Sequence, residues 1–350
     1  GQLFPFALVT GSTPRASEKC SLTAIRKSYY DIKMSDSNTK IIRGLHNCRQ
    51  QHRGAVLTIG NFDGLHLGHQ KIFEQLNLVA EKFDTHSCLM TFEPLPREYF
   101  SKGQNAARLM NRGEKIRGLS NMHETTCPDY TLIMRFDEAL ASMSAAQFIE
   151  NILIDILAVK AVIIGDDFRF GNDRQGDFKL LQEFGERHQF AVASIDSHCI
   201  DDQRVSSSLI RVALAEDRLA DADRMLGRRY TICGRINHGD KRGRTIGFPT
   251  ANIHLRRTET PLHGVYSVTM HSRHGDIAGI ANIGRRPTVD GERVQLEVHL
   301  FDFDKTIYGE QVGVSFQHKI RDEKKFDSFD DLKQQINIDC DKARQLLSMK

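Results

Sequence analysis

A strand-like run, a glycine-rich loop and a helix-like run follow one another between residues 55 and 83. Residues 55–59 are apolar and predict a buried strand, residues 60–68 predict a tight loop, and residues 70–83 carry apolar side chains at helical spacing. A helix N-terminus offers unpaired backbone N–H groups, and glycines let the backbone approach phosphate oxygens closely. The segment therefore predicts an α/β domain that binds a polyphosphate.

Two histidines, His66 and His69, lie at the end of this loop. Each imidazole can donate a hydrogen bond to a phosphate oxygen and, when protonated, offset negative charge as pyrophosphate leaves. The pattern H-x-G-H alone is weak, because most loop histidines are solvated or cap a helix. The longer order G-N-F-D-G-x-H-x-G-H resembles the nucleotidyltransferase superfamily, and in particular its flavin adenylyltransferase branch. The other loop residues expected to bind nucleotide are Gly60, Asn61, Asp63 and Gly68.

The composition limits the classes of function. At 350 residues the chain is long enough for two domains. Its net charge of +3 gives no support to nucleic-acid binding and is compatible with small anionic substrates. The seven cysteines are scattered and form no C-x-x-C pair, which argues against a disulfide framework or a zinc site and favours a reducing cytoplasm. The most apolar stretch, residues 152–165, is too short to span a membrane. The composition does not decide whether the chain forms a homo-oligomer.

The first 33 residues differ from the rest of the chain. They mix Ser, Thr, Lys and Arg without sustained periodicity, which predicts a disordered upstream extension. A secretory signal is a weaker alternative, because the apolar residues 3–9 follow no basic region and precede no clear cleavage site.

The remaining chain has two halves with different patterning. From residue 54 to about residue 220, strand-like runs alternate with helical ones, which predicts a Rossmann-like, doubly wound parallel sheet with ligands at the carboxyl ends of its strands. After residue 227, short strand candidates separated by Gly, Pro, Asn and Asp predict a small antiparallel β-barrel, closed by an amphipathic helix at residues 330–347. We place the α/β domain at residues 40–222 and the barrel domain at residues 223–350.

Three further segments of the first half carry candidate site residues. Residues 91–96, T-F-E-P-L-P, predict an irregular loop rather than a helix because of their prolines. Residues 165–171, G-D-D-F-R-F-G, could hold a planar ring and a ribose, although a solvated acidic turn with core phenylalanines explains them equally. Residues 206–211, S-S-S-L-I-R, precede a helical run; the hydroxyls can cap that helix or donate to phosphate, and Arg211 adds a fork suited to phosphate oxygens.

In order and spacing, these segments resemble the adenylyltransferase half of the bacterial bifunctional riboflavin kinase and FMN adenylyltransferase family, over roughly residues 41–226. The resemblance implies that His66 and His69 bind and activate ATP phosphates and that Arg211 holds the triphosphate. It also implies that Ser207 and Ser208 hold the triphosphate together with Arg211. The chain departs from the family pattern I-S-S-T-x-I-R at Val205, Ser208 and Leu209. The resemblance also implies a nucleotide contact by Asp167 and flavin contacts by Phe92, Pro94, Phe168 and Arg169.

In the second half, residues 238–252, H-G-D-K-R-G-R-T-I-G-F-P-T-A-N, combine glycines and basic residues and look too irregular for a simple strand. The side-chain oxygens of Thr250 and Asn252, two residues apart, can both face Mg²⁺, a hard cation that prefers oxygen ligands. A basic hairpin followed by a strand cap is the plainer alternative. The loop glycines expected to bind nucleotide are Gly239, Gly243 and Gly247.

Residues 296–302, L-E-V-H-L-F-D, form a strand candidate with Glu297 among apolar neighbours. A carboxylate there could take a proton from an attacking hydroxyl, although most strand glutamates face water. Together with residues 264–266, 282–288 and 320–326, these motifs resemble a riboflavin kinase domain. The resemblance implies that Thr250 and Asn252 bind Mg²⁺ and ATP and that Glu297 is the general base on the flavin 5′-hydroxyl. It also implies that residues 239–247 cover the phosphates and that Arg321 contacts the flavin.

The resemblance as a whole implies a bifunctional transferase with riboflavin, FMN and ATP as substrates. The barrel domain would phosphorylate riboflavin, and the α/β domain would join AMP to FMN and release pyrophosphate, giving FAD. Both steps are in-line displacements on phosphorus. The alternatives are a chain with one active half, another H-x-G-H transferase such as a lipid-headgroup cytidylyltransferase or a pantetheine-phosphate adenylyltransferase, and a non-catalytic flavin-binding regulator.

Overall fold

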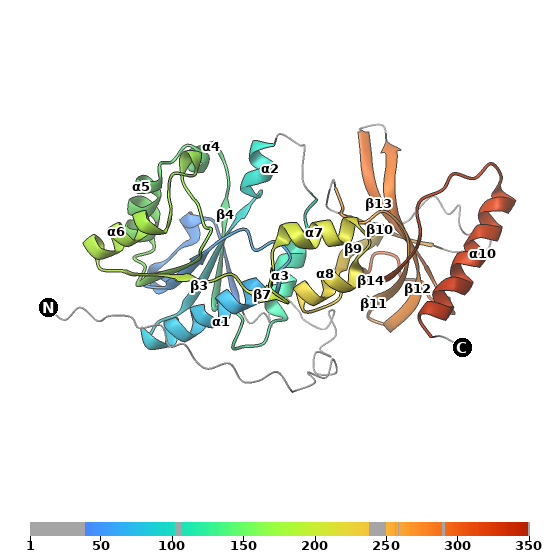
Figure 1. The fold of residues 1–350 in the computed structure, drawn as a ribbon, viewed down its shortest axis with the longest axis horizontal. Helices are drawn as coiled ribbons and strands as arrows, with labels where there is room; N and C mark the ends of the chain where they lie inside the picture. The colour runs from blue at the N-terminus through green and yellow to red at the C-terminus, as the bar shows by residue number, and fades with distance from the viewer. Residues whose placement is uncertain are drawn as a thin grey trace.

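The computed structural model describes residues 39–101, 107–237, 250–255, 257, 259–288 and 291–348. Figure 1 shows an α/β domain followed by a β-barrel, with the last helix on the far side of the barrel. The extension predicted for residues 1–33 and the glycines Gly239, Gly243 and Gly247 lie outside the described residues.

The first domain is a parallel sheet of six strands in the order β1-β4-β3-β2-β5-β6. Neighbouring residues of its central strands point to opposite faces, since Leu57 and Val162 pack into one apolar cluster and Val56 and Ile163 into another. Because both faces are covered, these central strands are mostly apolar. The predicted doubly wound sheet is confirmed. Its strands are β1 (Lys40–Arg43), β2 (Val56–Ile59), β3 (Ser87–Glu93), β4 (Tyr130–Arg135), β5 (Ala161–Gly165) and β6 (Ala191–Ile195).

Helices connect these strands and cover the sheet (Figure 1). The expectation of an irregular loop through Pro96 was wrong, because this proline is the first residue of α2. Proline fits there because the first turn of a helix leaves its N–H groups without intrahelical partners. The helices of this domain are α1 (Leu67–Lys82), α2 (Pro96–Phe100), α3 (Arg112–Ser120), α4 (Glu138–Ala141), α5 (Ala145–Gln147), the π-helix η4 (Phe148–Ile156), α6 (Phe178–His188), α7 (Ser207–Ala215) and α8 (Leu219–Leu226). Short elements are η2 (Leu45–Asn47), η3 (Gln50–His52), η5 (Asn172–Arg174) and the hairpin of β7 (Cys199–Ile200) and β8 (Gln203–Arg204).

The second domain is a closed antiparallel barrel in the order β10-β13-β12-β11-β14-β9, with α10 (Phe329–Leu346) packed against it. This confirms the predicted barrel and terminal helix. One expectation was wrong: residues from Thr250 onward are regular strand, because Ala251 and Ile253 are buried and alternate with the less buried Thr250 and Asn252. The strands are β9 (Thr231–Asn237), β10 (Thr250–His254), β11 (Gly264–Ser272), β12 (Gly275–Thr288), β13 (Gly291–Leu300) and β14 (Gln311–Arg321).

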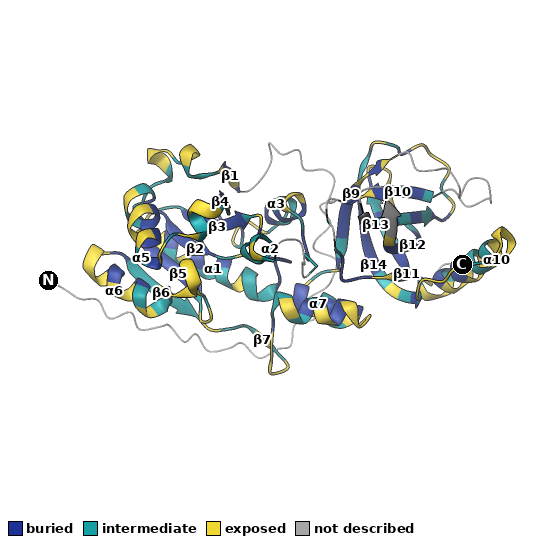
Figure 2. Ribbon diagram, turned by 90° about the horizontal axis from the view of Figure 1, so that it is seen from above, coloured by how far each residue is buried: buried dark blue, intermediate teal, exposed yellow. Residues whose placement is uncertain are grey.

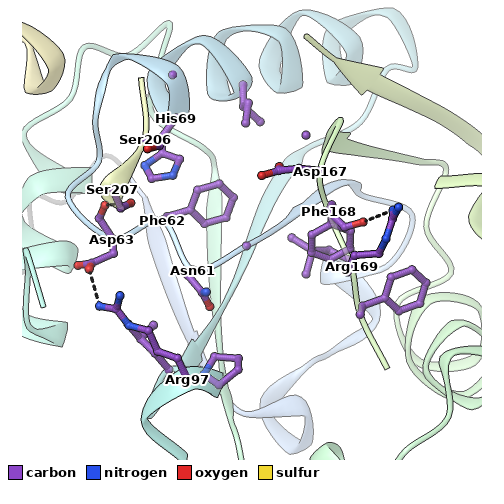
Figure 3. Close-up of a pocket in the computed structure, with 18 of the residues that line it drawn as sticks. Asn61, Phe62, Asp63, His69, Arg97, Asp167, Phe168, Arg169, Ser206 and Ser207 are labelled. Carbon is purple, nitrogen blue, oxygen red and sulfur yellow. Dashed lines mark hydrogen bonds and ion pairs between the residues drawn. The ribbon is translucent and has the colours of Figure 1, made fainter. Parts of the chain in front are cut away.

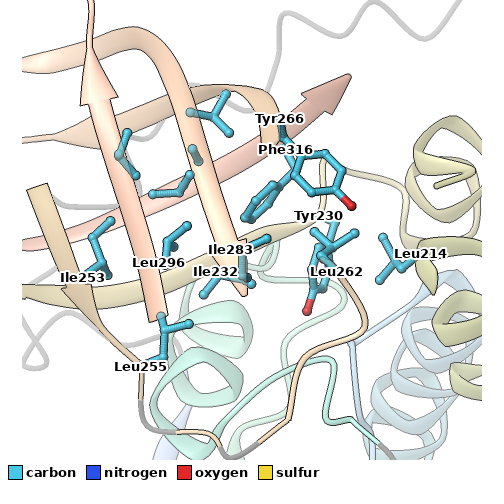
Figure 4. Packing of buried hydrophobic residues seen from close by; sticks show 14 of the residues in the cluster. Leu214, Tyr230, Ile232, Ile253, Leu255, Leu262, Tyr266, Ile283, Leu296 and Phe316 are labelled. Carbon is cyan, nitrogen blue, oxygen red and sulfur yellow. The ribbon is translucent and has the colours of Figure 1, made fainter. Parts of the chain in front are cut away.

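The two domains share an apolar seam. Leu214 of α7 belongs to the same buried cluster as Tyr230, Tyr266 and Phe316 of the barrel (Figure 4). Figure 2 shows the corresponding burial, with buried barrel strands and an α7 helix that is exposed along part of its surface. The domain boundary predicted between residues 222 and 223 falls inside α8, a helix that packs on the barrel.

Candidate active sites

A cavity of about 680 Å³ opens at the carboxyl ends of β2, β3 and β5. In the strand order, β3 and β5 lie on opposite sides of β2, so the chain changes direction in the sheet at this point. Such a switch point is where open α/β sheets bind ligands. Figure 3 shows Asp63, His69 and Ser207 on one side of the cavity and Asp167 and Phe168 on another.

The loop between β2 and α1 is held by side chains from outside it. Lys115 of α3 donates to Asn61 O at 2.6 Å, Ser207 of α7 donates to Asp63 O at 2.7 Å, and Gln70 of α1 donates to Leu65 O at 3.0 Å. The loop needs such support, because Phe62 and Leu65 adopt left-handed conformations with φ of 44° and 45°. Gly60, Asn61, Asp63 and Gly68 all line the cavity, and their contacts with nucleotide stay predictions.

His66 and His69 lie together at the start of α1. The rings stack with centroids 3.5 Å apart, and Nδ1 of His66 caps the helix by accepting the His69 N–H at 3.3 Å. Burial, followed by the charge of Arg228, lowers the pKa of His66 to about 3, and burial also holds the pKa of His69 well below 6.5. In this structure the imidazoles are therefore neutral at neutral pH. They can donate N–H groups to phosphate, while the positive charge that we expected of them comes from arginines.

Asp63 organises those arginines. Its buried carboxylate accepts the N–H groups of Leu109 and Met110 at 3.1 and 3.0 Å and pairs with Arg97 at 3.1 Å and Arg211 at 3.0 Å. Burial would raise the pKa of Asp63, but Arg211, Lys115 and the Met110 N–H outweigh burial and lower it. Arg97 and Arg211 both line the cavity. Arg97 was missed, although it directly follows the T-F-E-P-L-P segment.

Three buried nitrogen atoms around Asp63 have no hydrogen-bond partner among the described residues. They are Nδ1 of His69, Nε of Arg97 and Nε of Arg211. Unpaired buried polar groups are costly and need an explanation, such as a ligand. Because all three residues line the cavity, we expect an anion with several oxygen atoms to satisfy them.

The three serines at the start of α7 make different contacts. Ser206 caps the helix by accepting the Leu209 N–H at 3.2 Å, and Ser207 holds Asp63 O. Ser208 Oγ lies 3.4 Å from Arg211 Nη1, and Ser206, Ser207 and Ser208 all line the cavity. Hence Ser207 supports the loop in addition to facing the predicted triphosphate position.

Aromatic side chains line another part of the cavity. Phe168 stacks on Phe170 with centroids 5.6 Å apart, and Phe92 packs against Phe136. Phe100 also lines the cavity and is 64% exposed, so its ring is accessible to a ligand. Phe100 and Phe136 were missed because the sequence gives no sign that their segments meet.

Of the residues predicted in segments 91–96 and 165–171 to contact flavin or nucleotide, all but one line the cavity. Phe92, Asp167, Phe168 and Arg169 line it, whereas Pro94 does not, and its neighbours Leu95 and Pro96 do. Asp167 pairs with Arg204 at 2.6 Å, so a second missed arginine lies at this side of the cavity.

A second candidate site lies on the outer face of the barrel. Asn252 of β10 is directly opposite Glu297 of β13, and Glu297 is directly opposite Asn282 of β12. Gln295 Nε2 donates to Asn252 Oδ1 at 2.7 Å and to Glu297 Oε1 at 2.9 Å. Asn282 Oδ1 is buried without a hydrogen-bond partner in the described part of the chain. Thr250 lies on the same face as Asn252, two residues earlier in β10.

Arg321 has a structural partner. Its guanidinium pairs with Asp339 of α10 at 2.9 Å, and Asp339 is almost fully buried. This ion pair anchors α10 on the barrel. The predicted contact of Arg321 with flavin therefore stays a prediction.

These features define a class of protein: a two-domain chain with a cavity suited to an anion at the switch point of a parallel sheet, followed by a barrel with an oxygen-lined outer face. Residues 48–209 match the family model described as FAD synthetase, and residues 226–347 match the one described as riboflavin kinase. A bifunctional riboflavin kinase/FMN adenylyltransferase of Haemophilus influenzae is 49% identical over 307 residues, which cover 87% of this chain and 98% of that protein. The protein of the same description from Escherichia coli K12 is 45% identical over 312 residues, covering 89% and 98%. The chain therefore belongs to the bifunctional riboflavin kinase/FMN adenylyltransferase family.

One solved structure supports the architecture over both domains. It is described as a macrolide-efflux protein from Streptococcus pneumoniae, is 31% identical, and superposes with a TM-score of 0.70 over 86% of this chain and 97% of its own. Within the described ranges, we find no helix long and apolar enough to cross a membrane.

Proposed function

We propose that the cavity of the α/β domain adenylylates FMN and that the outer face of β10 and β13 phosphorylates riboflavin. Family membership makes the chain a transferase with both activities: one ATP converts riboflavin to FMN with release of ADP, and a second ATP converts FMN to FAD with release of pyrophosphate. The assignment of residues to these steps is our proposal. The observation that carries it is the set of unpaired buried nitrogens of His69, Arg97 and Arg211 in one cavity.

In the adenylyl step, a phosphate oxygen of FMN attacks the α-phosphorus of ATP, and the bond to pyrophosphate breaks. The arginines Arg97 and Arg211, held by Asp63, would offset the charge of the triphosphate. The neutral imidazoles of His66 and His69 would donate hydrogen bonds to its oxygens, most strongly as charge develops on the leaving pyrophosphate. The cavity thus supplies positioning and charge, and no covalent intermediate is needed.

The aromatic part of the same cavity would hold the flavin. Phe92, Phe168 and the exposed Phe100 offer apolar rings suited to an isoalloxazine. Phosphate-binding nitrogens and aromatic rings therefore line one continuous cavity. This arrangement supports a reaction between a flavin phosphate and a nucleoside triphosphate.

In the kinase step, Glu297 would accept the proton of the riboflavin 5′-hydroxyl as that oxygen attacks the γ-phosphorus of ATP. The site fits Mg²⁺ in its chemistry, because Thr250, Asn252 and Glu297 present hydroxyl, amide and carboxylate oxygens and Asn282 Oδ1 is buried without a partner in the described chain. Thr250 and Asn252 would hold the ion. When bound, Mg²⁺ would neutralise phosphate charge in the transferred group.

A cytoplasmic location and a homo-oligomeric state stay predictions. The six cysteines in the described residues are all free thiols, which supports a reducing compartment.

The test is to incubate the protein with riboflavin, ATP and Mg²⁺ and to separate the flavins by chromatography, beside the variants His66→Ala and Glu297→Ala. We expect the wild type to make FMN and then FAD, the His66 variant to stop at FMN, and the Glu297 variant to be slow in making FMN while converting supplied FMN to FAD. If the wild type binds flavin but makes neither FMN nor FAD, the alternative of a non-catalytic flavin-binding regulator would be supported instead. Loss of the same step in both variants would refute the two-site assignment.

A further inference from the structure

The segment that joins the two domains contacts the histidine loop directly. Nη2 of Arg228 donates to Gly64 O at 2.7 Å, and Nη1 donates to Leu226 O at 3.2 Å and more weakly to Leu65 O at 3.4 Å. One guanidinium therefore ties the end of α8 to the two residues that precede His66. Its planar fork suits such a contact with several carbonyl oxygens.

The neighbouring Gly227 brings the same segment against the start of α1. It has a φ of 71°, and a Cβ atom built on it would lie 2.6 Å from Cδ2 of Leu67. Leu67 is the first residue of α1 and follows His66. The close approach needs glycine, so the joining segment is packed on the loop from two adjacent positions.

The part of the loop that Arg228 holds includes one unfavourable backbone conformation. Leu65, which has a side chain, has a φ of 45°, whereas the φ of 91° at the neighbouring Gly64 costs a glycine little. A conformation like that of Leu65 persists only where surrounding contacts determine it. Other side-chain contacts to loop carbonyls come from β3, α1, α3 and α7 of the α/β domain, whereas Arg228 lies beyond that domain's helices.

We propose that Arg228 is a positioning residue of the adenylyltransferase site, which holds the Gly64–Leu65 backbone so that His66 and His69 face the triphosphate. Residue 228 lies outside the segment that matches FAD synthetase and inside the segment that matches riboflavin kinase. The second family segment thus completes the site of the first. The inference rests on the proposed role of His66. The position of the Arg228 charge, which helps to keep His66 neutral, agrees with it.

The experiment measures both half-reactions in the full chain for Arg228→Ala, Arg228→Lys and the neighbouring control Arg229→Ala. Arg229 is exposed and pairs with Asp223 instead of the loop. FAD formation is followed from supplied FMN, and total FMN plus FAD is followed from riboflavin. For Arg228→Ala we expect kcat for FAD formation to fall about 30- to 100-fold with a much smaller change in the KM for ATP, because misplacing catalytic groups costs turnover more than binding.

Riboflavin phosphorylation should stay near the wild-type rate in all three variants. Arg228→Lys should recover only part of the lost turnover, since an ammonium cannot reproduce the guanidinium fork. Guanidinium chloride at a non-denaturing concentration should raise the turnover of Arg228→Ala and leave Arg229→Ala unchanged. That rescue separates a positioning role from a general folding defect.

Two results would overturn the inference: wild-type FAD formation in Arg228→Ala, or equal loss of both half-reactions without rescue by guanidinium. His66→Ala is measured beside these variants. If His66→Ala loses FAD formation while Arg228→Ala keeps it, the proposed site stands and only the positioning role of Arg228 fails. If His66→Ala keeps FAD formation, the proposed site itself is wrong.

Discussion

The two candidate sites of this chain are built in different ways. The α/β site depends on an irregular loop whose carbonyl groups are held by Lys115, Ser207 and other side chains from separate elements. The barrel site lies on regular strands, where the register alone places Asn252 opposite Glu297. A loop site can thus be disturbed by a change outside it, whereas a strand site should tolerate the loss of one supporting side chain.

The largest effect should come from Asp63→Asn. The amide keeps the shape of Asp63 but leaves Arg97 and Arg211 without their shared carboxylate. Because these arginines are placed for the triphosphate, we expect turnover to FAD to fall about 10²- to 10³-fold. Steady-state assays with supplied FMN measure this change, and riboflavin phosphorylation in the same variant is the control. Normal FAD formation would show that the loop site does not depend on its buried charge.

Glu114→Gln tests how much a buried ion pair between the two domains stabilises the fold. Glu114 of α3 pairs with Arg257, which follows β10, and the two side chains are only 1% and 2% exposed. Glu114 also accepts the Cys233 N–H at 2.7 Å. Removing one member of a buried ion pair leaves the other charge uncompensated, so we expect the free energy of unfolding to fall by about 3 kcal/mol.

Denaturant unfolding followed by circular dichroism measures this loss, since the chain has no tryptophan. The exposed pair of Glu216 and Arg218, at 59% and 47% exposure, gives the control Glu216→Gln, for which we expect a change below about 1 kcal/mol. Equal losses in both variants would contradict a special role for the buried pair.

The contrast between the sites explains how far the sequence could be interpreted. Alternating strand-like and helical runs predicted the parallel sheet, and short strand candidates predicted the barrel. The motifs identified Asn252 and Glu297, but only the pairing of β10 with β13 shows that they lie opposite each other. The loop motif identified His66 and His69, but it did not predict that they are neutral. Their pKa values are lowered mainly by burial, which depends on the assembled cavity rather than on the local sequence. Arg97, Arg204 and Phe100 reach that cavity from segments whose meeting no local pattern reports. The β10 strand was missed because glycines and basic residues precede it.

Two alanine substitutions, one in each site, sharpen the comparison between the loop site and the strand site. Ser207→Ala removes the donor to Asp63 O in the loop site, and we expect FAD turnover to fall about tenfold, the effect of one lost hydrogen bond in a positioned loop. Gln295→Ala removes the amide between Asn252 and Glu297, but the strand pairing keeps both residues in place. We therefore expect riboflavin phosphorylation to change by less than about threefold. The reverse ranking, measured by initial rates, would reject the distinction between loop and strand sites.

The smallest effect concerns acid stability of the loop site. Burial lowers the pKa of His66 from 6.5 to about 3, so between these values the unfolded chain binds a proton that the folded chain does not. The free energy of unfolding must then fall as the pH falls below 6.5. Between pH 7 and pH 5.5, the free energy of unfolding of His66→Gln should therefore fall by about 1 kcal/mol less than that of the wild type. Circular dichroism at each pH measures this difference, with the exposed His123→Gln as control. Parallel pH curves for wild type and His66→Gln would mean that His66 is already accessible to protons in the folded loop, and that the arginines alone do not carry the site's charge.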